Sequence, residues 1–141
     1  MVTCDTSVIC ERVHPQAKLP GKAHPSDACY DLVTPVEGRI AVGATGHIDL
    51  GLVVQLEEGW EIQIRGRSGM AKRGIVVHQG TVDHLYRGHL GVLIHNLSDQ
   101  DFVYEAGDRV AQMKVSRVWE VELVEGAVER TERGGFGSTG R

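Results

Sequence analysis

Residues 65–96 concentrate the side chains of this chain that could do chemistry on a charged ligand. An aspartate, a tyrosine and a serine flanked by arginine and glycine occur there beside four arginines, which are Arg65, Arg67, Arg73 and Arg87. Fixed positive charges combined with hydroxyl and backbone donors suit phosphate oxygens. The stretch therefore predicts a site for a phosphorylated ligand, with scaffold on either side of it.

Asp83 is the candidate proton acceptor of this stretch. It follows a β-branched pair and precedes residues 84–88 (HLYRG), at the end of a predicted hairpin over residues 76–82. A carboxylate held there can accept a proton from water, an effect worth roughly 10²–10⁴ in rate. The same spacing fits a turn residue that hydrogen-bonds its own backbone, which on spacing alone is the commoner case.

The turn at residues 66–69 (GRSG) is a candidate anion site. Ser68 is predicted as the N-cap of a short helix over residues 69–73, which Gly74 ends. A helix N-terminus presents backbone N–H groups to an anion, and Arg67 adds a positive charge beside it.

The glycine-rich segment at residues 133–141 (RGGFGSTGR) is the second candidate. It cannot build a packed element, because glycine loses much backbone entropy on ordering and little apolar surface is available. Phe136 offers a stacking face, and glycine amides with Ser138 and Thr139 offer donors to phosphate. The segment is either a mobile chain end, which composition alone favours, or a lid that orders over a ligand.

These stretches, with two others, carry a resemblance to a known family. In order, residues 28–32 (ACYDL), 66–71 (GRSGMA), 80–88 (GTVDHLYRG), 107–113 (GDRVAQM) and 133–140 (RGGFGSTG) resemble the motifs of the trimeric deoxyuridine triphosphate nucleotidohydrolase (dUTPase) family. The resemblance covers the chain from about Ala28 onward. It implies an all-β, distorted jelly-roll β-barrel, assembled as a homotrimer with shared active sites.

The resemblance also implies a reaction. dUTP is hydrolysed to dUMP and pyrophosphate, which limits uracil incorporation into DNA and supplies dUMP for thymidylate synthesis. A water activated by Asp83 attacks the α-phosphorus in line. The implied cofactor is Mg²⁺, held mainly by substrate phosphates and water rather than by direct protein ligands, with Asp31 as a candidate contact through water.

The implied substrate-binding residues come from several motifs: Arg67, Ser68, Gly69, Val77, His78, Gln79, Gly80, Val82, Tyr86, Gln112, Arg130, Arg133, Phe136, Gly137, Ser138 and Thr139. Asp31 and Asp108 are expected to support this network. The family's usual arginine position before the glycine-rich motif is Thr131, so the γ-phosphate contact is left open between Arg130 and Arg133. Arg130 is preferred because it needs the smaller register shift.

The nucleoside is expected to meet a different set of groups. Tyr86 should pack under the deoxyribose and leave no room for a 2′-hydroxyl, while backbone groups of the predicted hairpin read uracil. Phe136 should stack on the base. The hairpin lacks the asparagine of many relatives, which leaves His78, Gln79 or backbone groups alone to select against dCTP and dTTP. Leu85 replaces a second acidic residue, which leaves Asp83 as the proton acceptor.

The rest of the sequence predicts an all-β scaffold. Apolar and polar residues alternate strictly at residues 60–65, and eighteen glycines lie mostly between such runs, which favours a sandwich or barrel. The predicted strands are residues 1–11, 39–42, 48–56, 60–65, 91–96, 102–104, 109–116 and 119–124. The barrel is expected to span residues 1–124, and residues 125–141 to form a C-terminal arm and flexible lid of the same domain.

Length, composition and charge limit the classes of protein to which this chain can belong. At 141 residues the chain is expected to form one core. No apolar run suits secretion or membrane insertion. Its three cysteines, at positions 4, 10 and 29, lack metal spacing and predict free thiols in a reducing, cytoplasmic compartment. The net charge of −4 offers no broad basic field for nucleic acid.

Other functions are disfavoured by particular residues. The seven histidines do not have zinc-site spacing. A dCTP deaminase would share the barrel, but that family places a catalytic glutamate where this chain has Leu93. A nucleotide-binding module without turnover would need neither Asp83 nor the complete glycine-rich segment.

Overall fold

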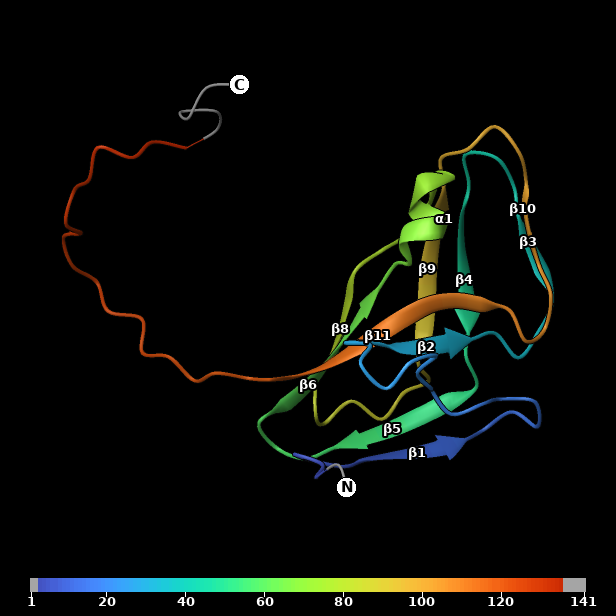
Figure 1. Ribbon diagram of the computed structural model, residues 1–141, viewed down its shortest axis with the longest axis horizontal. Helices are drawn as coiled ribbons and strands as arrows, with labels where there is room; N and C mark the ends of the chain where they lie inside the picture. The colour runs from blue at the N-terminus through green and yellow to red at the C-terminus, as the bar shows by residue number, and fades with distance from the viewer. Residues whose placement is uncertain (1–2, 136–141) are drawn as a thin grey trace.

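The computed structural model describes residues 3–135, which form small antiparallel sheets and one short helix (Figure 1). In chain order the elements are β1 (Val8–Arg12), β2 (Tyr30–Val33), β3 (Gly38–Ile40), β4 (Thr45–Asp49), β5 (Leu52–Leu56), β6 (Trp60–Arg65), α1 (Ser68–Lys72), β7 (Ile75–Val77), β8 (Gly80–Val82), β9 (Gly91–Asn96), β10 (Phe102–Tyr104) and β11 (Arg109–Arg117). The predicted all-β fold of jelly-roll type is confirmed, including its one short helix.

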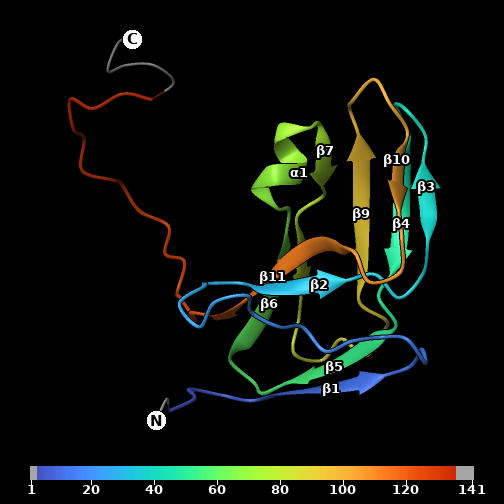
Figure 2. The same cartoon turned by 45° about the vertical axis from the view of Figure 1, so that its right-hand side comes forward.

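The strands are grouped by pairing rather than by chain order. The largest sheet has the order β2-β11-β6-β8, a second has the order β4-β9-β7, and β1-β5 and β10-β3 form two-stranded pairs. Figure 2 shows β3, β4, β9 and β10 standing together, with β1 and β5 crossing beneath the large sheet. Because sequence neighbours lie in different sheets, the chain crosses repeatedly between the layers.

The core lies between these sheets and is almost wholly aliphatic. On β6, Ile62 and Ile64 are buried, and across the ladder they face Val115 and Met113 of β11. The predicted alternation of this strand is confirmed, because the pleat sends alternate side chains to opposite faces. Full burial of such a side chain contributes about 1.5–3 kcal/mol.

Several predicted strands are confirmed closely. The strands at residues 60–65, 91–96 and 102–104 have the predicted bounds, and the strand predicted at 109–116 extends to Arg117. The predicted edge strand at residues 1–11 is found as β1, displaced toward its C-terminal end. These strands have the clearest alternation or the sharpest flanking turn residues.

The single strand predicted at residues 48–56 is wrong. The chain bends between β4 and β5 at Gly51, whose φ of 67° is readily adopted only by glycine. The Gly51 N–H donates to Asp49 Oδ1 at 2.8 Å, which stabilises the bend. The bend lets β4 pair with β9 while β5 pairs with β1.

The hairpin predicted over residues 76–82 is also wrong. β7 pairs with β9 and β8 pairs with β6, so these two strands belong to different sheets. Val77 and Val82 are both buried. Residues 78 and 79 therefore form a crossing between sheets.

The strand predicted at residues 119–124 is absent from the described structure. After β11 the chain leaves the body as an extended segment (Figure 1), and residues 118–135 have no assigned secondary structure. Trp119 is 78% exposed and Leu123 is 91% exposed. A strand requires a neighbour for its backbone hydrogen bonds, and the described part of this single chain offers none to this segment.

No helix within residues 3–135 is long and apolar enough to span a membrane.

Asn96 supplies a test of the core. Its side chain is fully buried, with Nδ2 donating to the Ile40 and Gln100 carbonyls and Oδ1 accepting the Ser98 N–H. Asn96→Ala should lower the free energy of unfolding by about 3 kcal/mol, because buried partners lose their hydrogen bonds. Asp99→Ala, an exposed position in the same turn, should change it by less than about 0.5 kcal/mol. Urea denaturation of both variants measures the difference, and equal stabilities would contradict this role for Asn96.

Candidate functional site

A polar hollow of about 450 Å³ lies where the turn after β6 meets β2 and β11. It is lined by Ala23, Asp27, Ala28, Cys29, Asp31, Arg67, Ser68, Gly69, Arg109 and Gln112. Five of the predicted site residues, from three separate stretches of the sequence, thus line one hollow: Asp31, Arg67, Ser68, Gly69 and Gln112. We call it the anion hollow.

Asp31 lies between two arginines of the anion hollow. Its Oδ1 is 3.7 Å from Arg67 Nε, and its Oδ2 is 3.7 Å from Arg109 Nε. Arg67 also donates through Nη1 to the Arg109 carbonyl at 3.3 Å. The Asp31 side chain is only 21% exposed, so this carboxylate orients both guanidinium groups from within the wall. A guanidinium has further N–H groups beyond Nε, which remain to meet an anion.

Gln112 lies on β11, between the two strands β2 and β6 that border the hollow. It is opposite Asp31 of β2 on one side and opposite Arg65 of β6 on the other. Its Nε2 donates to the Gly66 carbonyl at 2.8 Å. Gln112 therefore fixes the point at which the chain leaves β6 and turns toward Arg67.

The turn into α1 differs from the prediction at its cap. The N-cap residue is Arg67, with extended φ and ψ of −98° and 138°, and it makes no side-chain capping hydrogen bond. Ser68 is instead the first helical residue, so its predicted role as N-cap is wrong. The first N–H groups of any helix lack an intrahelical partner, and Ser68 and Gly69 present theirs at the exposed rim of the hollow. Gly74 ends the helix with a φ of 82°.

A second hollow, of about 280 Å³, lies beside β8. Its lining residues are Ile64, Gly80, Thr81, Val82, Tyr86, His89, Leu90 and Gly91. Tyr86 borders it, and its hydroxyl donates to the His89 carbonyl at 2.8 Å. This hollow is mostly apolar and carries an aromatic ring, which suits a sugar or a base better than a phosphate. We call it the nucleoside hollow.

Asp83 lies directly after β8 and is exposed in the single chain. Its carbonyl accepts the Tyr86 N–H at 3.1 Å, which closes the turn that follows it. The anion hollow and the nucleoside hollow have no lining residue in common, and Asp83 lines neither. The described chain therefore does not bring Asp83 together with the predicted phosphate donors.

The remaining predicted residues lie elsewhere. Asp108 is in the turn before β11, where its Oδ2 accepts the Glu105 N–H at 2.8 Å. The His78 N–H donates to the Leu93 carbonyl at 2.8 Å, and Gln79 follows it in the crossing between sheets. Arg130 and Arg133 belong to the exposed segment after β11. Four further predicted residues, Phe136, Gly137, Ser138 and Thr139, lie outside the described residues.

Arg109 is a lining residue that the sequence reasoning missed. It lies inside the 107–113 stretch, three positions before Gln112, and a basic residue close to a predicted phosphate donor was the available signal. Its contact with Asp31 depends on the pairing of β2 with β11, where the register shifts between Arg109 and Ala111. That irregularity could not be read from the residue pattern.

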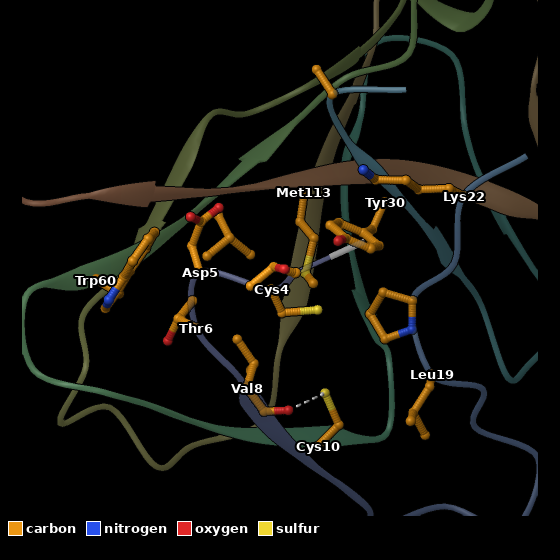
Figure 3. A pocket seen from close by; sticks show the side chains of 14 residues that line it. Cys4, Asp5, Thr6, Val8, Cys10, Leu19, Lys22, Tyr30, Trp60 and Met113 are labelled. Carbon is orange, nitrogen blue, oxygen red and sulfur yellow. Dashed lines mark hydrogen bonds between the residues drawn. The ribbon is translucent and has the colours of Figure 1, made fainter. Parts of the chain in front are cut away.

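A third hollow, of about 500 Å³, has a mixed polar and apolar lining (Figure 3). It is lined by Thr3, Cys4, Asp5, Thr6, Val8, Cys10, Leu19, Pro20, Lys22, Ala28, Tyr30, Trp60, Met113 and Val115. Burial raises the pKa of the Cys10 thiol, which donates to the Val8 carbonyl at 4.0 Å, so Cys10 is not set up as a nucleophile. None of the predicted site residues lines this hollow.

The chain is similar to known proteins over nearly all its length. Residues 15–140 match the sequence profile of the family described as dUTPase. The deoxyuridine 5'-triphosphate nucleotidohydrolase of Helicobacter pylori is 39% identical over 136 residues, covering 92% of this chain and 94% of the relative. That of Wolinella succinogenes is 43% identical over 136 residues, covering 92% and 91%. The dUTPase of Staphylococcus bacteriophage 80alpha, solved as a G164S mutant with dUpNHpp, superposes with a TM-score of 0.83 at 23% identity, covering 95% of this chain and 98% of that one.

Arg67 tests the anion hollow without any nucleotide. Arg67→Gln should weaken the binding of inorganic tripolyphosphate about tenfold, because hydrogen bonds to charged groups contribute about 1.5–3 kcal/mol. Arg39→Gln is the matched control, since Arg39 also pairs with an aspartate, Asp101, but does not line the hollow. Isothermal titration calorimetry measures both affinities. An equal loss in the two variants would mean that general charge, rather than this hollow, attracts the anion.

Proposed function

The chain belongs to the dUTPase family, and from this membership we propose that it hydrolyses dUTP to dUMP and pyrophosphate by in-line attack of a water on the α-phosphorus. The observation that carries the proposal is the gathering of Asp31, Arg67, Ser68, Gly69 and Gln112 around one polar hollow. A triphosphate requires several fixed donors in one place, and phosphoryl transfer depends mainly on positioning and electrostatic stabilisation.

The anion hollow binds the phosphate chain in this proposal. Arg67 and Ser68, with the N–H groups at the start of α1, donate to phosphate oxygens. Arg109 joins them, because Asp31 holds its guanidinium beside that of Arg67. Gln112 keeps the turn in place through Gly66. Donors fixed before substrate arrives need little reorganisation as negative charge shifts toward the leaving group.

Asp83 is the proposed proton acceptor. It is exposed in the single chain, so a water has access to it. As a carboxylate it takes a proton from the water while a new bond forms between the water oxygen and the α-phosphorus. The bond from that phosphorus to the bridging oxygen breaks at the same time, and pyrophosphate leaves with the electron pair.

Mg²⁺ is the proposed cofactor, and the residues of the anion hollow fit a cation that arrives with its substrate. The described residues contain no cluster of three or more histidine, cysteine, aspartate or glutamate side chains that could hold a metal by themselves. Asp31 is a carboxylate already engaged by two arginines, which suits a contact through water. When bound, Mg²⁺ neutralises charge on the phosphates.

The nucleoside hollow is the proposed site of deoxyuridine. Gly80 and Val82 supply backbone groups along its wall, and Tyr86 supplies the ring that packs against the sugar. The Tyr86 hydroxyl is already engaged by the His89 carbonyl, which holds the ring at one orientation. A ring fixed in this way discriminates against a 2′-hydroxyl by steric overlap. Val77, His78 and Gln79 precede this wall and complete the proposed uracil site.

A homotrimer with shared active sites is the proposed assembly. Within one chain, the phosphate donors and the Tyr86 hollow have separate linings, and Asp83 belongs to neither. A second chain that brings its nucleoside hollow to the anion hollow of the first would complete the site. Heterologous contacts of this kind close into a ring when the rotation allows it.

The segment after β11 is the proposed arm between subunits. Trp119, Val121 and Leu123 are exposed, and apolar side chains in water do not stabilise a monomer. The third hollow, around Trp60 and Met113, has apolar side chains that such residues of a neighbour could cover. Beyond the arm, residues 133–141 form the proposed lid, with Phe136 over the base and Arg130 or Arg133 at the γ-phosphate.

The proposed compartment is the cytoplasm, where the thiols at Cys4, Cys10 and Cys29 stay reduced; all three are free in the structure. There the reaction would lower the concentration of dUTP, limit uracil incorporation into DNA, and supply dUMP for thymidylate synthesis.

The function is tested by pyrophosphate release from dUTP, dCTP, dTTP and UTP, each assayed with Mg²⁺ on the purified protein. Release from dUTP alone is expected, because the hydrogen-bonding groups of a buried base site are left unpaired by the wrong base, which gives discrimination of about 10⁴ or more. Release from several nucleotides would contradict the selectivity, and release from none would contradict the function.

Asp83→Asn tests the proton acceptor. The variant should keep nucleotide binding and assembly but lose turnover by about 10²–10⁴, the range for loss of a general base. Asp99→Asn is the matched control, because it makes the same chemical change at an exposed site that lines neither of these hollows. Single-turnover assays with dUTP, together with gel filtration, make the comparison. Turnover near the wild-type rate in Asp83→Asn would show that another group accepts the proton.

A further inference from the structure

We propose that Asp49 and His89 form a positioning pair that anchors the loop of residues 83–89, and through that loop sets Tyr86 and Asp83 for reaction. The inference rests on the proposed hydrolysis of dUTP, because it assigns to that site two residues outside the motifs that define it. His89 borders the nucleoside hollow, whereas Asp49 lines neither hollow. The pair acts by holding Tyr86 and Asp83, the groups assigned to sugar binding and proton transfer.

The first observation is the contact itself. Asp49 Oδ2 and His89 Nδ1 are 2.8 Å apart, and they join the end of β4 to the loop before β9. The other carboxylate oxygen of Asp49 accepts the Gly51 N–H at 2.8 Å. The carboxylate is therefore fixed by the β4–β5 bend before His89 meets it. A preorganised acceptor loses less entropy on pairing than a freely rotating one.

The second observation is the path from His89 to the site. The His89 carbonyl accepts the Tyr86 hydroxyl at 2.8 Å, so the residue that binds Asp49 also holds the aromatic ring. The ring lies against Gly88, where an added side-chain carbon would collide with the Tyr86 hydroxyl. Displacement of His89 would therefore move the Tyr86 ring, and with it the wall of the nucleoside hollow.

The third observation is the shortage of other anchors. The loop closes on itself through the Tyr86 N–H to the Asp83 carbonyl, at 3.1 Å, and through Arg87 Nη1 to the His84 carbonyl, at 2.6 Å. Within residues 3–135, the only side-chain hydrogen bond from this loop to another element is the one between His89 and Asp49.

The backbone after the loop gives the pair a rigid base. The Leu90 N–H donates to the Leu52 carbonyl at 2.8 Å, and the Leu90 carbonyl accepts the Leu50 N–H at 2.9 Å. Leu90 is thus locked into the same bend that Asp49 stabilises. His89 stands at the boundary between this fixed backbone and the more exposed residues 83–88. An anchor at that boundary limits how far the loop can swing.

The surroundings of Asp49 favour its charged carboxylate form. Burial opposes ionisation of Asp49, but the Gly51 N–H, the His89 hydrogen bond and the charges of His89 and His47 outweigh it and hold the pKa of Asp49 below its usual value. The folded-state pKa is depressed, so the stabilisation is present above the ordinary carboxyl pKa of about 3.9 and is lost as pH falls below it. A neutral imidazole can also donate through Nδ1, so the contact does not require a charged His89.

The test compares Asp49→Ala and His89→Ala with the wild type in two measurements. Hydrogen exchange of residues 83–89, measured by mass spectrometry without nucleotide, should be about fivefold faster in both variants, the upper range for loss of an exposed ion pair. With dUTP, kcat should fall about tenfold, more than KM changes, because small displacements of reacting groups are costly in rate. The preference for dUTP over UTP, as a ratio of kcat/KM values, should also fall about tenfold as the Tyr86 ring loosens.

Two further variants separate positioning from general destabilisation. In His89→Asn, the side-chain amide can donate where Nδ1 did, so most of the lost kcat should return. Asp101→Ala is the matched control. Asp101 also accepts a loop amide, the Val42 N–H at 3.1 Å, and pairs with Arg39 at 3.5 Å, but it lines neither of these two hollows. It should leave the exchange of residues 83–89, kcat and the dUTP preference unchanged.

Each outcome decides the inference. Unchanged exchange of residues 83–89 in Asp49→Ala would overturn the anchor, whatever the activity. Faster exchange with unchanged kcat and unchanged dUTP preference would overturn the positioning role. If the wild-type protein released no pyrophosphate from dUTP, the proposed function would fail by itself, and the exchange measurement would still decide whether Asp49 anchors the loop.

Discussion

The pairing of β6 with β11 is the constraint on which the rest of the structure depends. Ile62 and Ile64 meet Val115 and Met113 across this ladder, and the contact buries aliphatic side chains at the centre of the core. β6 then leads directly into the turn of the anion hollow. Its other edge pairs with β8, which leads to Asp83. One buried strand pair therefore positions both the phosphate donors and the proposed proton acceptor.

Much of this scaffold could be predicted, because alternation of apolar and polar residues reports burial directly. It identified β6 with its observed bounds. Alternation does not report which strand lies alongside, and this explains the errors. Residues 76–82 were expected to pair with each other, yet β7 and β8 are buried by different sheets. Residues 48–56 keep one parity through a bend that depends on the backbone angle of Gly51.

The site could be predicted residue by residue but not in its arrangement. Gln112 and Arg67 were identified as phosphate donors from short motifs, and the structure lines one hollow with both. The contact of Arg109 with Asp31 depends on an irregular register that no motif contains. The Asp49–His89 contact joins residues 40 positions apart, and nothing in the neighbourhood of either residue indicates the other. Contacts of this kind depend on the folded chain path.

The proposed site is divided between two hollows that share no lining residue, so a single chain does not bring all its groups together. The anion hollow has charge, but both carboxylates in its lining are already engaged, Asp31 by two arginines and Asp27 by the His24 N–H. The nucleoside hollow has an aromatic wall and lies beside Asp83, but it has no phosphate donor in its lining. In the proposed homotrimer, the exposed apolar segment after β11 would contact a neighbouring chain.

The most direct test of this account mixes two impaired variants, Asp83→Asn and Arg67→Gln, by joint unfolding and refolding in equal amounts, with each variant refolded alone as the baseline. If each site takes Asp83 from one chain and Arg67 from another, about a quarter of the sites in randomly mixed trimers contain both intact residues. The account therefore predicts that the mixture recovers about a quarter of the wild-type dUTP turnover, as measured by pyrophosphate release. A mixture no more active than its two components would contradict the account, because it would show that one chain supplies both residues to each site.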